Sequence, residues 1–318
     1  MVKILAISLF SVNIVLFLLF SITQHFPLYA LFIHAISILV LLGWILYSQS
    51  LPPFLKKHVL DIVLVFTIFV IAFTVYAHKV DVVTPGIQGD EITIARVAEQ
   101  VFSSSEYVPF VNANYGHPTP LLYFTGFIIK LLGKTLFAIR LHSILFGALS
   151  VAAFYVLLRL FFKKNVSSIT ALMMLFSYPL VAVSRLAYEI TPSLFFQILT
   201  LIFLYLAWKT KNIKYYAAVG LSLGAGLYTY VGFRTFAFII IAICALLIFK
   251  TVKHGKKMAQ QFAVFFLTIF VVAMPLFSYS YNHFEEIMAR AKYLSPFSQE
   301  LPAIEVFKEL QGATLRLT

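Results

Sequence analysis

Two neighbouring carboxylates, Asp90 and Glu91, follow the turn Gly86-Ile-Gln-Gly89 and begin a short amphipathic segment. A carboxylate with a pKa of about 4 is a weak base at neutral pH, so it needs positioning, burial or a carboxylate neighbour to act as a general base. The same residues suit a helix start, because Asp is a favoured N-cap and Glu is favoured in the first turn. Asp90 is therefore a candidate base with Glu91 as a supporting carboxylate, and helix capping by Asp90 is the alternative.

Three arginines, Arg140, Arg185 and Arg234, fall at the predicted ends of apolar segments, on the same side of the membrane as these carboxylates. A guanidinium binds a phosphate through two parallel hydrogen bonds, so the three predict a site for an anionic group. The ordinary alternative is an arginine that extends to lipid headgroups. Glu189, four residues after Arg185, belongs to the same candidate site and also has the spacing of a salt-bridge partner.

His117 begins a His-Pro-Thr-Pro turn, and Tyr228 and Tyr230 lie shortly before Arg234. As binding residues, the histidine would donate to a phosphate and the tyrosines would form the wall of a headgroup pocket. The alternatives are a structural turn and aromatic residues of the membrane interface. No second ligand at metal spacing accompanies His117, and no Walker loop or dinucleotide-binding glycine pattern is present. The sequence thus predicts no cofactor and leaves a divalent metal open.

Membrane-spanning helices are the elements that must hold these residues. Of the 318 residues, 61% are hydrophobic and 11% charged, against about 25% charged in a soluble protein. Apolar runs close to the roughly 20 residues that cross a bilayer predict an all-α polytopic membrane protein. The nine predicted spans are residues 4–22, 28–48, 59–78, 140–162, 166–184, 191–208, 215–231, 233–250 and 259–280.

A tenth apolar run, residues 121–132, is short and contains Lys130, so we predict an interfacial helix there. With a cytoplasmic N-terminus, nine spans place the lysines of the short loops inside the cell, as the positive-inside rule requires. Those lysines are Lys56, Lys57, Lys163, Lys164, Lys209, Lys211, Lys214, Lys250, Lys253, Lys256 and Lys257. Residues 79–139 then form a large outer loop with interfacial helices. Topology explains the net charge of +12 better than binding to nucleic acid does.

The order of these motifs resembles that of GT-C membrane glycosyltransferases, specifically glycosyltransferase family 39, which contains protein O-mannosyltransferases and aminoarabinose transferases. The motifs are Gly89-Asp-Glu91, His117-Pro-Thr-Pro-Leu-Leu-Tyr123, Arg140-Leu-His-Ser-Ile-Leu-Phe-Gly147, Ser184-Arg-Leu-Ala187 and Tyr228-Thr-Tyr-Val-Gly-Phe-Arg234. By comparison with that family we expect two extra N-terminal helices in residues 1–58, a GT-C-like catalytic core in residues 59–280, and an outer segment in residues 281–318 that is incomplete at its C-terminal end.

The resemblance implies transfer of a sugar from a polyprenyl-phosphate donor to a protein, lipid or glycan acceptor on the outer face of the cytoplasmic membrane, with inversion. It implies that Asp90 is the base and that Arg185 and Arg234 hold the lipid phosphate. The alternatives are a transporter or flippase for a polyprenyl-linked lipid and a non-catalytic membrane assembly subunit. Transporters usually carry polar site residues near the bilayer midplane, whereas the middle of the predicted spans is almost free of ionisable residues.

Overall fold

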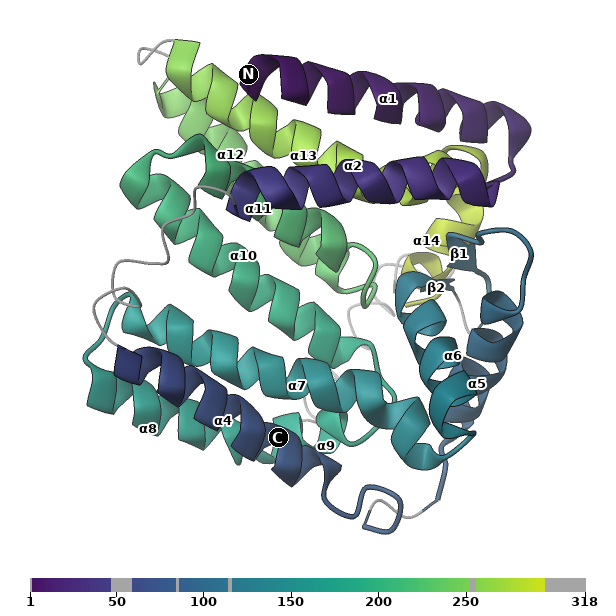
Figure 1. Cartoon of the computed structure of the whole chain (residues 1–318), viewed down its shortest axis with the longest axis vertical. Coiled ribbons are helices and arrows are strands. Elements are labelled where there is room, and N and C mark those ends of the chain that lie inside the picture. The colour runs from purple at the N-terminus through teal and green to yellow at the C-terminus, as the bar shows by residue number, and fades with distance from the viewer. Residues whose placement is uncertain (1, 47–58, 84–85, 114–115, 252–255, 295–318) are drawn as a thin grey trace, which may run out of the picture.

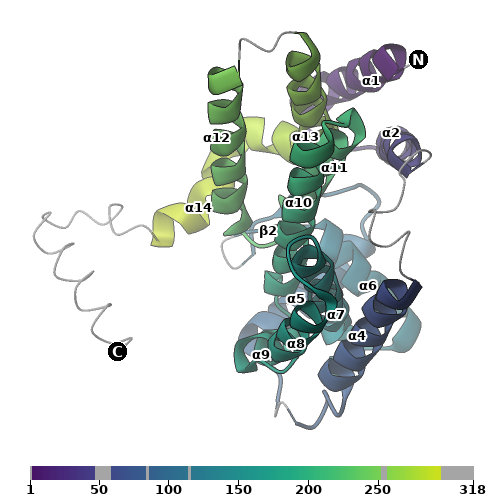
Figure 2. The ribbon, with the colours of Figure 1, turned by 90° about the vertical axis from the view of Figure 1, so that its left-hand side faces the viewer.

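The computed structural model describes residues 2–46, 59–83, 86–113, 116–251 and 256–294. Long apolar helices lie side by side, and two shorter helices lie across one end of them (Figure 1, Figure 2). The helices that lie side by side are α1 (Val2–Thr23), α2 (Leu28–Leu46), α4 (Val59–Ala77), α7 (Leu136–Arg159), α10 (Ile190–Thr210), α11 (Ile213–Gly226), α12 (Phe233–Thr251) and α13 (Lys256–Asn282). The predicted all-α class is confirmed.

Helix length and hydropathy identify the parts of the described chain that can cross a membrane. Four helices are long and apolar enough: α4, α7, α10 and the part of α13 from Ala259 to Asn282. A bent helix pair adds a fifth candidate, and shorter apolar helices cover Ser8–Thr23, Tyr29–Ile45 and Phe233–Cys244. The chain is therefore a multi-pass membrane protein, while the number of nine spans stays a prediction.

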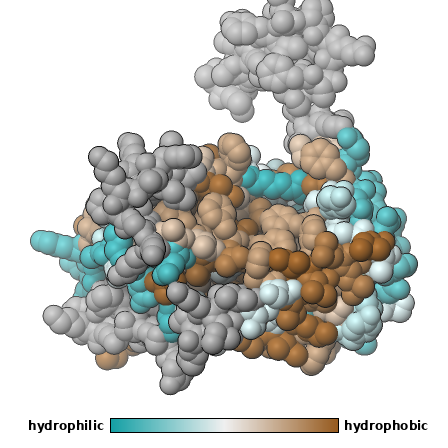
Figure 3. All heavy atoms as spheres, turned by 90° about the horizontal axis from the view of Figure 1, so that it is seen from above, coloured by the Kyte–Doolittle hydropathy of each residue, from teal (hydrophilic) through white to brown (hydrophobic). Residues whose placement is uncertain are grey.

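The outer surface of the helices is largely apolar. On α4, for example, Val59, Phe66 and Val70 are all exposed. Figure 3 shows a broad apolar area with hydrophilic residues towards its two ends. Soluble monomers rarely expose apolar patches of this extent, whereas a lipid-facing surface has this composition.

The predicted span over residues 166–184 is not one continuous helix but a bent pair of helices, which together remain a candidate span. It consists of α8 (Lys164–Leu175) and α9 (Tyr178–Ser184), which meet at an angle of 57°. Pro179 lies in the first turn of α9. Its ring would clash with the carbonyl of Leu175, and it has no N–H to donate there, so the helix cannot continue through it. The predicted span 215–231 also ends early, since α11 stops at Gly226 and turns follow.

The loop between α4 and α7 contains the two shorter helices, α5 (Gly89–Phe102) and α6 (Pro120–Leu132), and a small antiparallel sheet of β1 (Phe110–Val111) and β2 (His117–Pro118). Gly126 of α6 lies against α5: a Cβ there would be 2.5 Å from the carbonyl oxygen of Ala98. Only glycine permits this close crossing, which fixes α5 on α6. The predicted helix over residues 121–132 is thus confirmed as a helix.

The N-terminal and C-terminal parts of the chain are in contact with each other. Leu16 and Phe20 of α1 pack against Met274 of α13, and α14 (Phe284–Leu294) follows α13. The division at residue 58 stays a prediction. The lysines at positions 56, 57 and 253 and the segment after residue 294, for which an incomplete outer segment was expected, lie outside the described residues.

Candidate functional site

The segment from Arg185 to Glu189 joins α9 to α10 and lies against the start of α5. The backbone N–H of Ala187 donates to Glu91 Oε1 at 2.9 Å. The carbonyl oxygen of Tyr188 accepts a hydrogen bond of 2.7 Å from Ser143 Oγ of α7. The segment is therefore fixed to both helices, and side chains that are far apart in the sequence meet around it.

Glu91 and Arg140 form an ion pair whose side chains are both 0% exposed. Arg140 Nε and Nη2 each donate to the carboxylate at 2.7 Å, and the guanidinium also donates to the carbonyls of Val80 and Gly86. The N–H of Gln88 donates to Glu91 Oε2 at 3.1 Å. Burial alone would raise the pKa of Glu91, but the hydrogen bonds from Arg140 and the backbone, with the charge of Arg140, lower it. The pair fixes the backbone on both sides of Asp90.

Asp90 itself is exposed, in the first turn of α5. The helix begins at Gly89 with Gln88 as its N-cap. The amphipathic helix predicted from Glu91 to about Phe102 is thus confirmed with a start two residues earlier, whereas the predicted cap at Asp90 is wrong. The hydroxyl of Tyr188 donates to the side-chain oxygen of Gln88. Burial, followed by the negative charges of Asp90 and Glu91, raises the pKa of Tyr188. An exposed carboxylate thus lies near an aromatic hydroxyl.

Arg185 lies at the C-terminal end of α4. Its guanidinium donates to the carbonyls of Val75, Tyr76 and Lys79 at 3.2 to 3.3 Å, where the negative end of the helix dipole favours a cation. Burial, followed by the charge of Arg140, lowers the pKa of Arg185, so two guanidinium groups share this region. The Arg185 bonds are longer than those of Arg140, which measure 2.7 to 2.9 Å. Each of these carbonyl bonds of Arg185 is therefore weaker than those of Arg140.

His117 and Glu189 form a further buried contact, with 3.0 Å between Nδ1 and Oε1 and exposed side-chain fractions of 11% and 8%. His117 lies in β2, opposite Val111 of β1. The sequence suggested Arg185 as an ion-pair partner of Glu189, whereas the ion pair that the structure describes for Glu189 is with His117. Their role in binding an anion stays a prediction.

Tyr228, Tyr230 and Arg234 lie in the turn between α11 and α12 and at the start of α12. Tyr228 is buried, and its hydroxyl donates to the carbonyl of Val272 at 3.1 Å, which fastens the turn to α13. Arg234 is half-buried, and its Nη1 donates to the carbonyl of Ile287 in α14 at 2.8 Å. Tyr230 is also half-buried.

The β1–β2 hairpin connects the two sets of residues. Phe110 of β1 packs with Tyr228 and Ile287 in one apolar cluster, while His117 of β2 contacts Glu189. The predicted site residues therefore form two neighbouring groups, with Asp90, Glu91, His117, Arg140, Arg185 and Glu189 in the first and Tyr228, Tyr230 and Arg234 in the second.

Sequence reasoning missed Gln88, Tyr188 and His142. The first two border Asp90, and their only signal in the sequence is that they neighbour predicted site residues. His142 is 2% exposed, and its Nδ1 lies 3.1 Å from the hydroxyl of Thr125 in α6. Within the described part of the chain, no cluster of three His, Cys, Asp or Glu side chains is arranged to hold a metal ion.

Comparison with known families identifies the chain. Residues 116–279, just over half of the 318 residues, match the family described as dolichyl-phosphate-mannose-protein mannosyltransferase. The chain belongs to this family. It is a GT-C membrane glycosyltransferase, as the order of its motifs implied. No curated protein matches the chain.

The match divides the candidate site of this glycosyltransferase in two. His117, Arg140, Arg185, Glu189 and Arg234 lie inside the matched region, together with both tyrosines of the α11–α12 turn. The Asp-Glu pair precedes it. The structure connects the two parts through the buried bonds from Arg140 and Ala187 to Glu91.

Proposed function

We propose that this glycosyltransferase moves a sugar from a polyprenyl-phosphate donor to a hydroxyl group of an acceptor on the outer face of the cytoplasmic membrane, with inversion at the anomeric carbon. The observation that carries the proposal is the position of Asp90. It is an exposed carboxylate near Tyr188, on a backbone that the buried Glu91–Arg140 pair holds in place. Family membership supports the donor class.

Asp90 acts as the general base. It accepts the proton of the acceptor hydroxyl while that oxygen forms a bond to the anomeric carbon. On the opposite face of the sugar, the bond from the anomeric carbon to the phosphate oxygen breaks, and its electron pair leaves with the phosphate. One displacement inverts the configuration and releases a polyprenyl phosphate.

The leaving phosphate needs positive charge close to it. Arg185 and Arg234 supply that charge, with His117 as a further donor, and fixed donors in a low-dielectric site stabilise a developing charge better than water does. Arg185 suits this role because its bonds to carbonyls are long, 3.2 to 3.3 Å, and can be exchanged for a phosphate. Arg140 positions the loop instead, since its shorter bonds commit it to Glu91 and to carbonyls.

A transfer assay tests the proposal. The purified protein in lipid vesicles is given a polyprenyl-phosphate donor with a radiolabelled sugar and a mixture of extracted envelope acceptors. We expect labelled acceptor and released polyprenyl phosphate in equal amounts. Movement of the intact donor across the bilayer without release of polyprenyl phosphate would contradict the proposal.

Replacing Arg185 and Arg234 by lysine together should weaken donor binding about tenfold or more, because an ammonium keeps the charge but loses the two-pronged geometry. The measurement is the dissociation constant of the polyprenyl-phosphate donor in vesicles. Arg159→Lys is the matched control, since Arg159 pairs with Asp61 at the other end of α7. Unchanged donor affinity in the double variant would remove these two arginines from the phosphate site.

The orientation can be measured by cysteine labelling in a Cys244→Ala background. Val82 is 73% exposed in the loop between α4 and α5, and Lys164 is exposed at the start of α8. We expect an impermeant thiol reagent to label Val82→Cys in intact cells and to label Lys164→Cys only after the cells are opened. The reverse pattern would place the site on the cytoplasmic side.

A further inference from the structure

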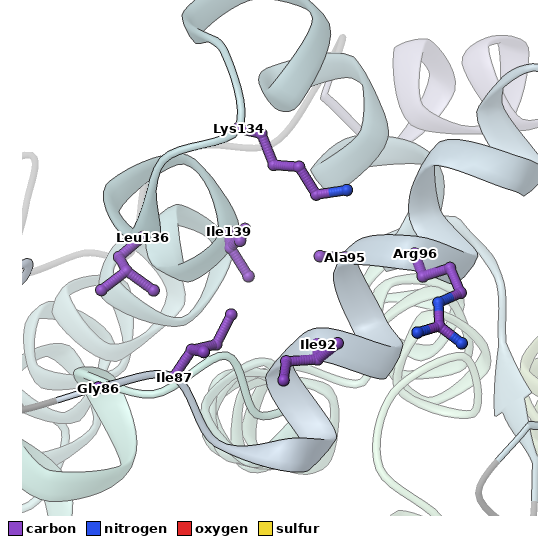
Figure 4. Close-up of a pocket in the computed structure, with 8 residues that line it drawn as sticks. All are labelled: Gly86, Ile87, Ile92, Ala95, Arg96, Lys134, Leu136 and Ile139. Atoms are coloured by element: carbon purple, nitrogen blue, oxygen red, sulfur yellow. The ribbon is translucent and has the colours of Figure 1, made fainter.

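A cavity of about 480 Å³ opens between the turn before α5, the first turns of α5, and the start of α7 (Figure 4). Its volume lies in the range of small-molecule sites. The lining residues are Gly86, Ile87, Ile92, Ala95, Arg96, Lys134, Leu136 and Ile139. None of them belongs to the residues proposed above for catalysis or donor binding.

The lining combines an apolar wall with positive charge. Isoleucines and Leu136 extend into the cavity, and Lys134 reaches towards it from the turn before α7 (Figure 4). Arg96 contributes a second cation and is exposed. Of the eight lining residues, two are basic and none is acidic. Such a cavity favours a ligand with one anionic group and an adjoining apolar part.

The position of the cavity narrows the ligand further. It lies between α5 and the start of α7, in the region that we predict to be at the outer membrane interface. The volume of about 480 Å³ holds a headgroup and the first methylene groups of a chain, but not a whole lipid. We infer that this cavity binds the phosphodiester headgroup of an anionic glycerolipid, with Arg96 and Lys134 on the phosphate and the isoleucines on the apolar part.

Glu99 is the carboxylate that pairs with one of the two cations of the cavity. Its carboxylate lies 2.5 Å from Lys134 Nζ, and these side chains are 40% and 56% exposed. An exposed pair of this kind contributes little, so a phosphate can replace the carboxylate on the lysine at small cost. Glu99 thus holds Lys134 at the cavity when the lipid is absent.

The cavity shares its wall with the loop that carries Asp90. The carbonyl of Gly86 accepts a hydrogen bond of 2.9 Å from Arg140, and Ile87 directly precedes the helix cap Gln88. A headgroup in the cavity therefore stabilises the backbone that places Asp90. The lipid composition of the outer leaflet would then affect how firmly the backbone around Asp90 is held.

The experiment uses the full chain in neutral detergent and dihexanoyl phosphatidylglycerol as the probe, with binding measured by equilibrium dialysis. Dihexanoyl phosphatidylcholine, inorganic phosphate and geranyl phosphate are the comparison ligands. We expect saturable binding of dihexanoyl phosphatidylglycerol, and we expect that none of the three comparison ligands displaces it effectively. Displacement by inorganic phosphate would reduce the cavity to a site for a free anion, and preference for geranyl phosphate would assign it to polyprenyl chemistry. Either result overturns the inference.

Three variants distinguish binding in the cavity from general attraction between charges. Arg96→Gln with Lys134→Gln should weaken binding at least tenfold, whereas Lys163→Gln with Lys164→Gln removes the same charge at the other end of the molecule and should leave it unchanged. Ile92→Trp fills the cavity without changing the charge and should also weaken binding at least tenfold; Ile92 is 43% exposed, so the larger side chain is tolerated. The inference would be overturned if the Arg96/Lys134 and Lys163/Lys164 double variants weakened binding equally, or if Ile92→Trp had no effect on binding.

Discussion

Replacing Asp90 by asparagine is expected to lower sugar transfer by a factor of about one hundred or more, because the amide cannot accept the proton of the acceptor hydroxyl. The folded protein should persist. Gln88, not Asp90, caps α5, so the change removes only a favourable charge at the helix start, worth about 0.3 to 1 kcal/mol. The measurement is the transfer rate at saturating donor, with the helical circular dichroism signal as a check on folding.

Asp81→Asn provides a matched control. Asp81 lies in the same loop and accepts a hydrogen bond of 2.8 Å from the N–H of Phe137 at the start of α7. An asparagine oxygen can still accept that bond, so transfer should stay near normal. If Asp90→Asn also retained near-normal transfer, the base would have to be another residue, and Asp90 would serve only the helix dipole.

The second large effect concerns stability. Glu91→Gln leaves the guanidinium of Arg140 buried without its counter-charge, which is expected to lower the free energy of unfolding by about 3 to 5 kcal/mol. The measurement is a reversible denaturant titration in detergent. Glu99→Gln is the control: its ion pair with Lys134 is roughly half-exposed, so its loss should cost no more than about 1 kcal/mol.

The double variant Glu91→Leu with Arg140→Met distinguishes a buried-charge effect from loss of packing. Removing both charges should restore part of the stability that a single change loses, because no uncompensated charge remains. Recovery will be incomplete, since the N–H groups of Gln88 and Ala187 lose their acceptor. Strictly additive losses would show that the two side chains do not act as a pair.

The sequence predicted the class of the fold and the neighbourhood of the site from two kinds of signal. Long apolar runs define helices whatever their partners are, and the Asp-Glu pair with its glycines is a local signature. Helix ends were less predictable. The break at Pro179 is predictable from the sequence, because proline disrupts a helix that continues into it from the preceding turn. The start of α5 at Gly89 is not, because it depends on the hydrogen bond from the N–H of Gln88 to Glu91.

Pairing of charges could not be predicted, because it depends on contacts between distant segments. Spacing on one helix suggested Arg185 for Glu189, yet Glu189 contacts His117 through a two-stranded sheet that leaves almost no pattern in the sequence. Likewise, Arg140 looked like a ligand for an anion by its position at a helix end. Its carboxylate partner lies 49 residues earlier in the chain, and only the folded structure brings the two together.

The buried bonds to Glu91 also set an order of assembly during synthesis. Arg140 follows Glu91 by 49 residues and Ala187 follows it by 96. At roughly 5 to 20 residues per second, about 5 to 20 seconds separate translation of Glu91 from translation of Ala187. Through that interval the nascent chain contains the carboxylate without its last hydrogen-bond donor, so the contacts that hold the loop around Asp90 are completed only after Ala187 has been synthesised. A chain that ends before Ala187 therefore has Glu91 without this donor, and one of the bonds that fix the backbone beside Asp90 is missing from it.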